Sequence, residues 1–544
     1  MSFLANCFER LKTLIHHSDS QRRLILVIVS TALLLDNMLY MVIVPIIPDY
    51  LTRVNSEFHI NWLDNQTHGG HKVFKNNQWN TLQNYNKTQI GRVEQSYDSD
   101  KFNVRLVTIN ASDAKVGTLF AFKAIVQLFV NPISGTVIDR IGYDMPMMIG
   151  LSIIFLSTSI FAFGSSYKTL FIARGLQGAG SAFADTAGFA MIADRYTEEN
   201  ERSKALGIAL AFVSFGCLVA PPFGGILYDL CGKEVPFIVL AFVALLDGFL
   251  MFFVMQPVRI DRMVKKAEGH LPEATPIWKL FMDPYVLICA GTLAVCNISL
   301  AFLEPTIANW MEKTMHATNV QVGLIWFPAF IPHVLGVVIT VKLAVKYPSY
   351  QWLMAGGGLV IIAVSCLMIP FCNNYISLMI PISILCFGVA LVDTAILPTM
   401  AYIVDTRHVS VYGSVYAIAD ISYSLAYAIG PIVAGGLVTF IGFTALNMVI
   451  FAVTIAYAPV LFLLRNMYQG PLQKDSEKIP LDVGQIAHAP NGELQTYTST
   501  IQSSVQYSGY DQDGQDYSRI APQQNPPTYN PYNAEPPYGA GYGY

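Results

Sequence analysis

Charged residues are scarce in this 544-residue sequence. Asp, Glu, Lys and Arg together make up only 13% of it, about half of the roughly 25% found in soluble domains. Hydrophobic residues make up 53%, which is more than a single soluble core can use. The shortage of charge argues against a soluble enzyme and against a nucleic-acid partner, and it favours a bundle of helices that faces lipid.

Cysteine is scarce as well, with eight residues in the chain. Most of them lie inside apolar runs, as Cys217, Cys289 and Cys386 do. Their spacing matches neither a metal-binding motif nor a disulfide framework. We therefore predict no metal site, and no cofactor is expected.

What the sequence does contain is a series of about twelve apolar segments, each near the ~20 residues that cross ~30 Å of hydrocarbon as an α-helix. The first segment follows Arg22-Arg23 and is too long for a cleaved signal peptide. The sequence predicts an all-α membrane protein with twelve transmembrane helices, at 24–47, 116–138, 145–164, 168–193, 204–228, 235–257, 285–309, 320–343, 352–371, 376–400, 411–440 and 443–465.

The basic residues of the short loops fall on one side of these spans, as Arg140 and Arg202 do. Because short cytosolic loops are rich in Lys and Arg, we predict that both termini are cytosolic. The long loop 48–115 is then lumenal. It contains three Asn-x-Ser/Thr triplets, which are glycosylation acceptors, at Asn65, Asn86 and Asn110.

The basic stretch 258–284 separates two sets of six spans. A Gly/Pro signature indicates that the two sets are related, because Ala220-Pro221 in the fifth span recurs as Gly430-Pro431 in the eleventh. Transporters built from repeats bind substrate near the midplane between their halves. The predicted organisation is a cytosolic N-terminus at 1–23, an N-terminal half at 24–257, a central cytosolic loop at 258–284, a C-terminal half at 285–465 and a disordered cytosolic tail at 466–544.

Several ionisable residues lie inside the spans, where each costs several kcal/mol unless it faces a partner or a wet cavity. Asp36 is in the first span, and Lys123 in the second is its natural counter-charge. The pair is either a permanent structural ion pair or a gate that breaks whenever Asp36 takes up a proton. Asp393 and Asp420 have no basic residue at comparable depth. That suits a cation site or a proton relay, and the alternative is an acid satisfied by hydrogen bonds.

Five further polar residues are less decisive. Asp185 is either functional or satisfied by the nearby hydroxyls of the same span. Glu304 is either a vestibule residue or simply solvated, and His333 either titrates between two compartments of different pH or is structural. Arg174 is expected to brace helices, and Asp247 is expected to be structural.

Aromatic residues accompany the acids of the second half. Trp326 and Phe330 are one turn apart, and Tyr416, Tyr423 and Tyr427 share a predicted helix face with the eleventh-span acid. A quaternary ammonium has no N–H to donate, so it is recognised by aromatic faces, each worth ~0.5–2 kcal/mol, together with a carboxylate. The stripe therefore fits either an organic cation site or ordinary packing.

Three motifs resemble those of the major facilitator superfamily. They are Gly135-Thr-Val-Ile-Asp139-Arg140-Ile-Gly142 after the second span, Arg174-Gly-Leu-Gln-Gly178-Ala-Gly180 in the fourth span, and Gly216 to Gly225 around Pro221 in the fifth. Two departures are that Tyr143-Asp144 replaces the usual basic pair and that Ala220 stands where Gly is common. The resemblance implies alternating access by two six-helix halves.

Longer runs resemble one branch of that superfamily, the vesicular amine transporters, over about residues 22–465. They are Leu35 to Pro48, Ala182 to Thr186 and Val404 to Asp420. The acetylcholine carriers of this family are the most similar, which implies exchange of two lumenal protons for one cytosolic acetylcholine across a synaptic vesicle membrane. A vesicular monoamine carrier is the alternative.

The resemblance also implies roles for single residues. The implied substrate-binding residues are Asp393, Trp326, Phe330, Tyr423, Tyr427 and Asn297. The implied proton-coupling and gating residues are Asp36, Lys123, Asp420, His333, Glu304 and Asp185. The tail is expected to meet sorting adaptors, through Glu477 to Leu481 or Tyr517 to Ile520, and WW-domain proteins through Pro526 to Tyr529.

Overall fold

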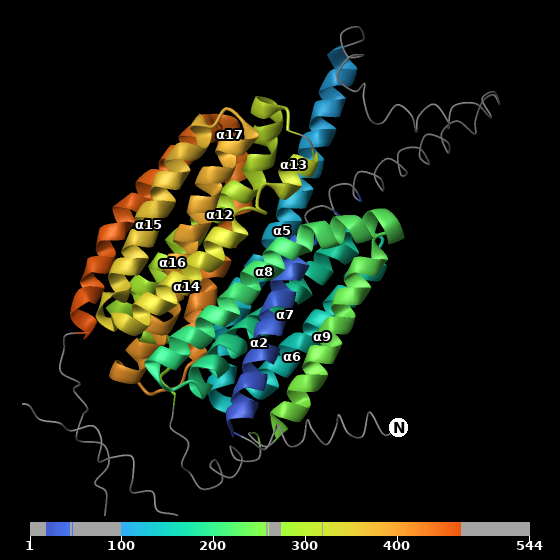
Figure 1. Cartoon of the computed structure of the whole chain (residues 1–544). Coiled ribbons are helices and arrows are strands. Elements are labelled where there is room, and N and C mark those ends of the chain that lie inside the picture. The colour runs from blue at the N-terminus through green and yellow to red at the C-terminus, as the bar shows by residue number, and fades with distance from the viewer. Residues whose placement is uncertain are drawn as a thin grey trace, which may run out of the picture. The chain divides into compact units, whose positions relative to one another are not determined.

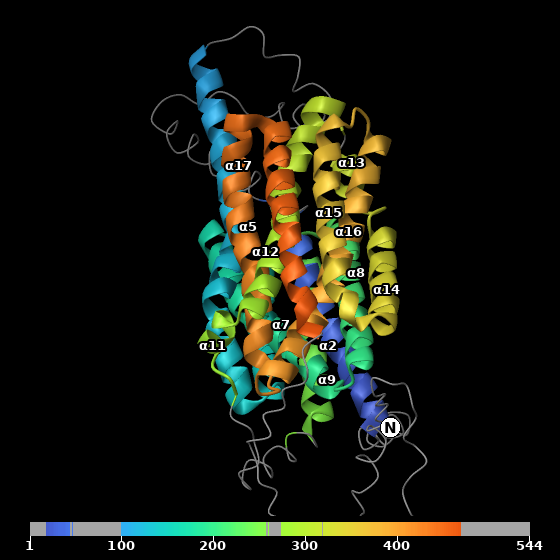
Figure 2. The same ribbon diagram turned by 90° about the vertical axis from the view of Figure 1, so that its left-hand side faces the viewer.

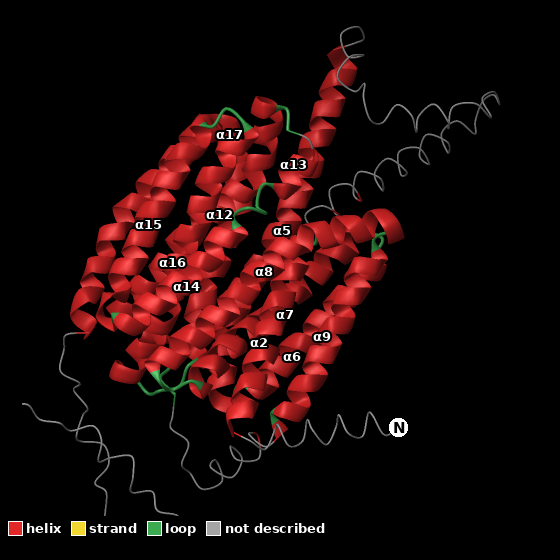
Figure 3. Ribbon diagram, viewed as in Figure 1, coloured by secondary structure: helices red, strands yellow, loops and turns green. Residues whose placement is uncertain are grey.

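The structure is a computed structural model, and the part of the chain that it describes consists of helices joined by short loops (Figure 1, Figure 3). Most of the predicted loop 48–115 and of the predicted tail 466–544 lies outside the described residues. The described residues are 18–43, 46, 50, 99–256, 259, 274–317 and 319–468.

The N-terminal half contains six long helices. Short loops separate most of them, and Ser166 shows how one is set, because its hydroxyl accepts a hydrogen bond from the Thr169 amide at 3.2 Å and caps the start of the next helix. The six helices are α2 (Ser18–Met41), α5 (Ser99–Ile141), α6 (Asp144–Phe163), α7 (Tyr167–Arg195), α8 (Glu199–Cys231) and α9 (Glu234–Val254).

The residues that the structure describes from 274 onwards form seven α-helices and three 3₁₀ segments, of which α11 precedes the C-terminal half. The α-helices are α11 (Ile277–Met282), α12 (Pro284–Met315), α13 (Asn319–Leu324), α14 (Phe330–Lys346), α15 (Gln351–Met368), α16 (Tyr375–Arg407) and α17 (Gly413–Tyr457). The 3₁₀ segments are η1 (Pro348–Tyr350), η2 (Ile369–Phe371) and η3 (Ala458–Tyr468).

Three of the predicted spans differ in form from a single straight helix. The span predicted at 320–343 is broken into α13 and α14 by a turn that holds Trp326 and Pro328, and proline cannot donate the backbone hydrogen bond that would continue the helix. The last two predicted spans form one assigned helix, α17, which is interrupted at Gly442. There φ is 79°, a left-handed conformation that glycine adopts without steric cost.

Ten of the described helical segments are long and apolar enough to cross a membrane. Two of the expected spans fall outside this set. α7 carries Arg174, Gln177 and Asp185 among many small residues, which lowers its hydropathy, and α14 has 17 residues. α7 packs against α2, α5 and α6, so its polar residues face other helices and not lipid.

α5 begins at Ser99, well before the predicted start at residue 116. No Gly or Pro lies between Ser99 and Val116, so nothing in this stretch breaks the helix. Asn110 therefore lies on a helix, whereas the sequence predicted a loop. The other two glycosylation acceptors, Asn65 and Asn86, lie outside the described residues.

The two halves meet mainly along two helix pairs, α5 with α17 and α8 with α14, and less extensively where α8 contacts α16 and α7 contacts α17. In Figure 1 the blue and green helices α2–α9 lie towards the right and the yellow to red helices α12–α17 towards the left, and Figure 2 shows α5 and α17 running along each other. α5 and α8 are the second and fifth long helices of their half, and α14 and α17 contain the second and fifth spans of theirs. The interface therefore repeats the same pairing twice, as two related halves require.

Candidate functional site

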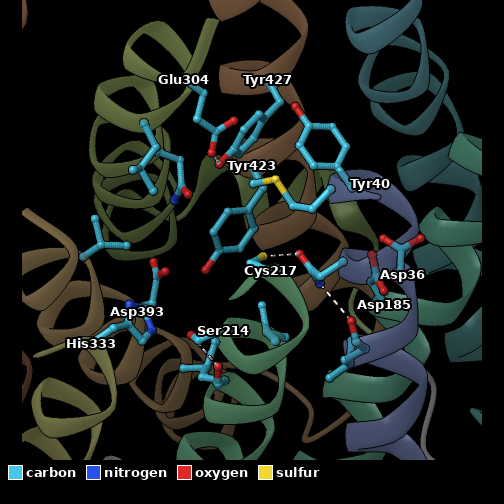
Figure 4. A pocket seen from close by; sticks show the side chains of 18 of the residues that line it. Asp36, Tyr40, Asp185, Ser214, Cys217, Glu304, His333, Asp393, Tyr423 and Tyr427 are labelled. Carbon is cyan, nitrogen blue, oxygen red and sulfur yellow. Dashed lines mark hydrogen bonds between the residues drawn. The ribbon is translucent and has the colours of Figure 1, made fainter. Parts of the chain in front are cut away.

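A cavity of ≈ 300 Å³ lies between the two halves. This volume is at the lower end of the roughly 300–1,000 Å³ typical of small-molecule sites. Figure 4 shows acidic and aromatic side chains pointing into it from helices of both halves. The cavity is lined by every residue for which the sequence implied substrate binding or proton coupling, namely Asp36, Lys123, Asp185, Asn297, Glu304, Trp326, Phe330, His333, Asp393, Asp420, Tyr423 and Tyr427.

Asp36 and Lys123 form an ion pair at one wall of this cavity. Lys123 Nζ lies 2.7 Å from Asp36 Oδ2. Both residues are buried, with an exposed fraction of 2% for Asp36 and 6% for Lys123. Ser181 on α7 donates a further hydrogen bond to Asp36 Oδ1. The close approach of α7 to α5 depends on Gly178, because a Cβ atom there would lie 2.2 Å from the Lys123 carbonyl oxygen.

Asp420 is held by a glutamine of the opposite half. Gln127 Nε2 on α5 lies 3.1 and 2.9 Å from the two carboxylate oxygens of Asp420 on α17, and 3.5 Å from Asp185 Oδ2. The nearby hydroxyls that the sequence offered as partners for Asp185 do not serve it, since Ser181 donates to Asp36 and Asp185 Oδ1 has no partner among the described residues. One amide thus joins two acids across the interface between the halves.

Asp393 on α16 is one of four acids of the cavity that have no ion-pair partner among the described residues, the others being Asp185, Glu304 and Asp420. Its Oδ1 makes no hydrogen bond of normal geometry within that part of the chain, although the residue is only 8% exposed. Tyr423 on α17 and Asn297 on α12 have their polar atoms near this carboxylate, and Figure 4 shows the Tyr423 hydroxyl pointing towards Asp393. A buried carboxylate that faces a cavity and lacks a counter-charge is a site for a cation or a proton.

The aromatic lining comes from three elements of the C-terminal half and, in the N-terminal half, from Tyr40 on α2 and Phe189 on α7. Trp326 is in the turn before α14, Phe330 begins α14, and Tyr423 and Tyr427 follow one another on α17. Tyr416 was predicted to share a helix face with Tyr423 and Tyr427, but it is not among the residues that line the cavity. Its ring stacks on Phe189 at 6.1 Å and its hydroxyl donates to the Leu397 carbonyl at 3.2 Å, so it packs into the core.

Glu304 and His333 lie at different places on the cavity wall. The Tyr427 hydroxyl is 3.4 Å from Glu304 Oε1, at the top of Figure 4, and the ring of Tyr427 meets that of Tyr40 edge-on at a centroid distance of 5.7 Å. His333 lies on the same side as Asp393, in the lower left of the figure. The acids therefore lie at several levels around one chamber.

Arg174 and Asp247 lie outside the cavity lining. Arg174 is fully buried, with its guanidinium 5.4 Å from the ring centroids of both Tyr40 and Phe120, and it donates to Gln177 at 2.7 Å. This position fits the expected bracing role, and the brace acts on aromatic rings. Asp247 on α9 is buried within the N-terminal half, away from the chamber.

Polar contacts join the two halves at the end of the bundle that carries Arg140, Arg202 and Arg407, here called the basic end. Arg202 on α8 lies 2.6 Å from Asp405 on α16 and 3.2 Å from the Tyr412 hydroxyl. The motif residue Asp139 accepts hydrogen bonds from the backbone amide and hydroxyl of Ser414. Arg140 is exposed, and Pro221, the third motif's proline, lines the cavity.

The phenol of Tyr412 is kept neutral at this end. Burial, together with the hydrogen bond that it donates to Asp405 at 2.6 Å, raises the pKa of Tyr412 well above its usual value. A neutral phenol can accept from Arg202 while donating to Asp405. The three side chains form a closed hydrogen-bonded group between the halves.

Sequence reasoning missed several polar residues of the site. Gln127 and Asn131 follow Lys123 on α5 at four-residue steps, so a polar stripe along one face of this apolar helix was visible in the sequence. Ser181 follows Arg174 by two helical turns and carries no such signal. Tyr40, one turn after Asp36, could have been found from the same spacing.

Comparisons with known proteins identify relatives that share most of the chain. The Major Facilitator Superfamily profile matches residues 26–418. The chain is 56% identical over 492 residues to the vesicular acetylcholine transporter of Drosophila melanogaster, and the match covers 90% of this chain and 78% of that protein. It is 53% identical to the vesicular acetylcholine transporter of Rattus norvegicus, with 82% and 83% covered.

Among solved structures, the human organic anion transporter MFSD10 (TETRAN) has a TM-score of 0.59 to this chain at 15% identity, covering 81% of this chain and 99% of that one. At this identity the likeness concerns the fold alone, and it confirms the predicted all-α transporter fold. The sequence identities and the profile match extend the assignment beyond the fold. The chain therefore belongs to the Major Facilitator Superfamily and, within it, to the family of vesicular acetylcholine transporters.

Proposed function

We propose that this protein is a proton-coupled antiporter that loads acetylcholine from the cytosol into acidic synaptic vesicles in exchange for lumenal protons. The observation that carries the proposal is the unpaired, buried carboxylate of Asp393, which faces a cavity lined by aromatic rings. The substrate is inferred from the relatives in Drosophila melanogaster and Rattus norvegicus, which are vesicular acetylcholine transporters.

The cavity suits a permanently charged ammonium. Asp393 supplies one negative charge, and the rings of Trp326, Phe330, Tyr423 and Tyr427 supply faces that attract a cation at ~0.5–2 kcal/mol each. A methylated ammonium cannot donate a hydrogen bond, so it is attracted to Asp393 only by the negative charge of the carboxylate. A proton that binds to Asp393 removes this charge, and proton and substrate therefore compete for the same carboxylate.

This competition provides the coupling. A proton that reaches Asp393 from the acidic lumen neutralises the carboxylate, weakens the hold on the ammonium and favours its release there. Loss of the proton on the cytosolic side restores the site. The Asp36–Lys123 pair and the Gln127–Asp420 contact lie on the same chamber and offer further positions where a proton changes the contacts between helices.

Alternating access follows from rocking of the two halves about their repeated interface. We assign the basic end to the cytosol, because Arg and Lys gather there. The contacts Arg202–Asp405 and Ser414–Asp139 join the halves at this end, so the conformation described is one in which the cytosolic side is closed. Opening requires these contacts to break.

Uptake into vesicles tests the proposal. Vesicles containing the chain should accumulate labelled acetylcholine only while the lumen is acidic, and an ionophore that collapses the gradient should abolish accumulation. Asp393→Asn should reduce uptake by about a hundredfold, the loss expected when a buried charge partner is removed. Asp247→Asn is the matched control, since it removes a buried acid outside the chamber. Normal uptake by Asp393→Asn would refute the site assignment.

The monoamine alternative is separated in the same assay. Unlabelled acetylcholine should compete with the labelled substrate, and serotonin should compete far less. Stronger competition by serotonin would transfer the protein to the other branch of the family.

A further inference from the structure

Tyr40 lies between two groups of the chamber, the Asp36–Lys123 ion pair and the Tyr427–Glu304 contact. It lies on α2, one helical turn after Asp36, and its ring lines the cavity. The ring of Tyr427, from α17 of the opposite half, meets it edge-on at 5.7 Å between centroids, and Figure 4 shows the two rings together at the top of the chamber. Through its hydroxyl, Tyr427 in turn reaches Glu304.

Two fixed cations are directed at the same ring. Lys123 Nζ lies 5.7 Å from the Tyr40 centroid, and the Arg174 guanidinium carbon lies 5.4 Å from it. Both distances are within the ~6 Å over which a cation is attracted by an aromatic face. Arg174 forms no ion pair with a carboxylate among the described residues, so the rings of Tyr40 and Phe120 and the hydrogen bond to Gln177 hold it.

Lys123 is therefore shared between a carboxylate and a ring. It lies 2.7 Å from Asp36 Oδ2 and at cation–π distance from Tyr40. When a proton binds to Asp36, the carboxyl becomes neutral and its attraction for the ammonium of Lys123 falls. The attraction of the Tyr40 ring does not change, so Lys123 is redistributed towards the ring.

We propose that Tyr40 is a positioning residue that couples protonation of Asp36 to the aromatic wall that holds the ammonium. A lysine drawn onto Tyr40 brings a positive charge closer to Tyr427, where it opposes the substrate's own charge and loosens the contact that bridges the halves. This inference rests on the proposed function, and it adds Tyr40 of the N-terminal half to the substrate-binding residues implied by the sequence, whose aromatic members all belong to the C-terminal half.

Other charged or titratable groups also face Tyr40 and share in its environment. They are Asp36 on its own helix, Lys123 on α5, Arg174 on α7, Cys217 on α8, Glu304 on α12 and Tyr427 on α17. Of these, Lys123 is the one whose ion-pair partner lies on the same helix as Tyr40. The coupling is therefore assigned to the Asp36–Lys123–Tyr40 group.

The test compares two substitutions of Tyr40 with one of its neighbour. Tyr40→Leu removes the ring, Tyr40→Phe keeps the ring and removes the hydroxyl, and Phe120→Leu is the matched control. Phe120 also contacts Arg174 and Tyr40, at 5.4 and 5.9 Å, but it does not line the cavity. Correct folding of each variant is checked by gel filtration and thermal melting.

The first readout is the affinity for acetylcholine at neutral and at acidic lumenal pH. In the wild type, acidification weakens binding. In Tyr40→Leu the ratio of the affinity at neutral pH to the affinity at acidic pH should fall by about tenfold, as expected for the loss of a partly buried cation–π contact. In Tyr40→Phe and in Phe120→Leu this ratio should stay at the wild-type value. The second readout is the ratio of pH-driven accumulation to exchange without a gradient, which should fall in Tyr40→Leu.

The outcomes are distinct. An equal loss of affinity at both pH values in Tyr40→Leu would make Tyr40 a simple wall residue and overturn the inference. The same flattening in Phe120→Leu would assign the effect to packing around Arg174 and also overturn it. Absence of acetylcholine transport in the wild type would refute the proposed function itself, which is a separate result.

Discussion

Lys123 Nζ lies 2.7 Å from Asp36 Oδ2 between two membrane helices, and Ser181 completes the carboxylate's contacts from a third. The pair lies on the wall of the same cavity as the unpaired Asp393. One acid is thus paired with a lysine, while another, from the opposite half, has no ion-pair partner among the described residues, and we propose that it binds the mobile cation. The contrast between these two carboxylates underlies the predictions that follow.

The ion pair should show strong coupling in stability. Lys123→Ala leaves a buried carboxylate without its partner, and such a change costs about 3–5 kcal/mol. Replacing both residues, as in Asp36→Asn with Lys123→Met, should recover most of that loss because no buried charge remains. Thermal unfolding in detergent measures both. Losses that simply add would show that the two side chains do not depend on each other.

Gly178 should be intolerant of any side chain. A Cβ there would lie 2.2 Å from the Lys123 carbonyl oxygen, so Gly178→Ala must push α7 away from α5. We expect a loss of about 1–3 kcal/mol in the free energy of unfolding. The control is Gly357→Ala on α15, where nothing lies within 4 Å of the new Cβ, and which should gain up to about 1 kcal/mol. Similar melting temperatures for the two variants would contradict the close helix approach.

Arg202→Ala should open the basic end. Arg202 contacts Asp405 and Tyr412 of the other half, whereas Arg22, at the same end, contacts Glu201 of its own half at 2.7 Å. In a variant that keeps Cys217 as its single cysteine, an impermeant thiol reagent added at the basic end should then label this cavity residue about tenfold faster, because the loss of a partly buried pair is expected to destabilise the closed state by about 1.4 kcal/mol. Arg22→Ala should leave the rate unchanged.

An unchanged labelling rate in Arg202→Ala, or an equal increase in Arg22→Ala, would contradict the proposal that the contacts of Arg202 keep this end closed.

Asp283, just before α12, forms hydrogen bonds whose contribution to stability should be lost in acid. Burial alone would raise its pKa, but hydrogen bonds from Arg407 at 2.8 Å, from the Tyr285 amide and from His408 outweigh burial and hold the pKa of Asp283 below its usual value. A carboxyl with a lowered pKa stabilises the fold above its unfolded pKa of about 4, and the contribution is lost as the pH falls further. Melting temperatures measured below pH ~4 should therefore drop more steeply in the wild type than in Asp283→Asn. Parallel curves would contradict this.

Much of the site could be predicted because charges inside apolar spans are rare. Asp36, Lys123, Asp393 and Asp420 stand out in the sequence for that reason, and all four line the cavity. Gln127 did not stand out, because a neutral amide is common in a helix and its value here comes from two acids brought near it by folding.

Other features depended on geometry that spacing does not contain. Tyr416 has the right helical spacing for the cavity face, yet its hydroxyl reaches the Leu397 carbonyl in the core, because spacing gives a direction and not the neighbour that lies there. The helix break before Phe330 was not predicted, because the apolar run 320–343 has the length of one span and the helix-breaking effect of Pro328 was not weighed against it. The start of α5 at Ser99 was missed, because the prediction followed the apolar residues and did not consider that no Gly or Pro lies between Ser99 and residue 116.

The exchange of a proton for an ammonium on a buried carboxylate can be measured directly. Purified protein in weakly buffered solution near neutral pH should release protons when acetylcholine is added, because the cation binds the deprotonated form of Asp393 and displaces its proton. The release should disappear in Asp393→Asn and persist in Asp247→Asn. Saturable binding of acetylcholine to the wild type with no release of protons at any pH would contradict the account.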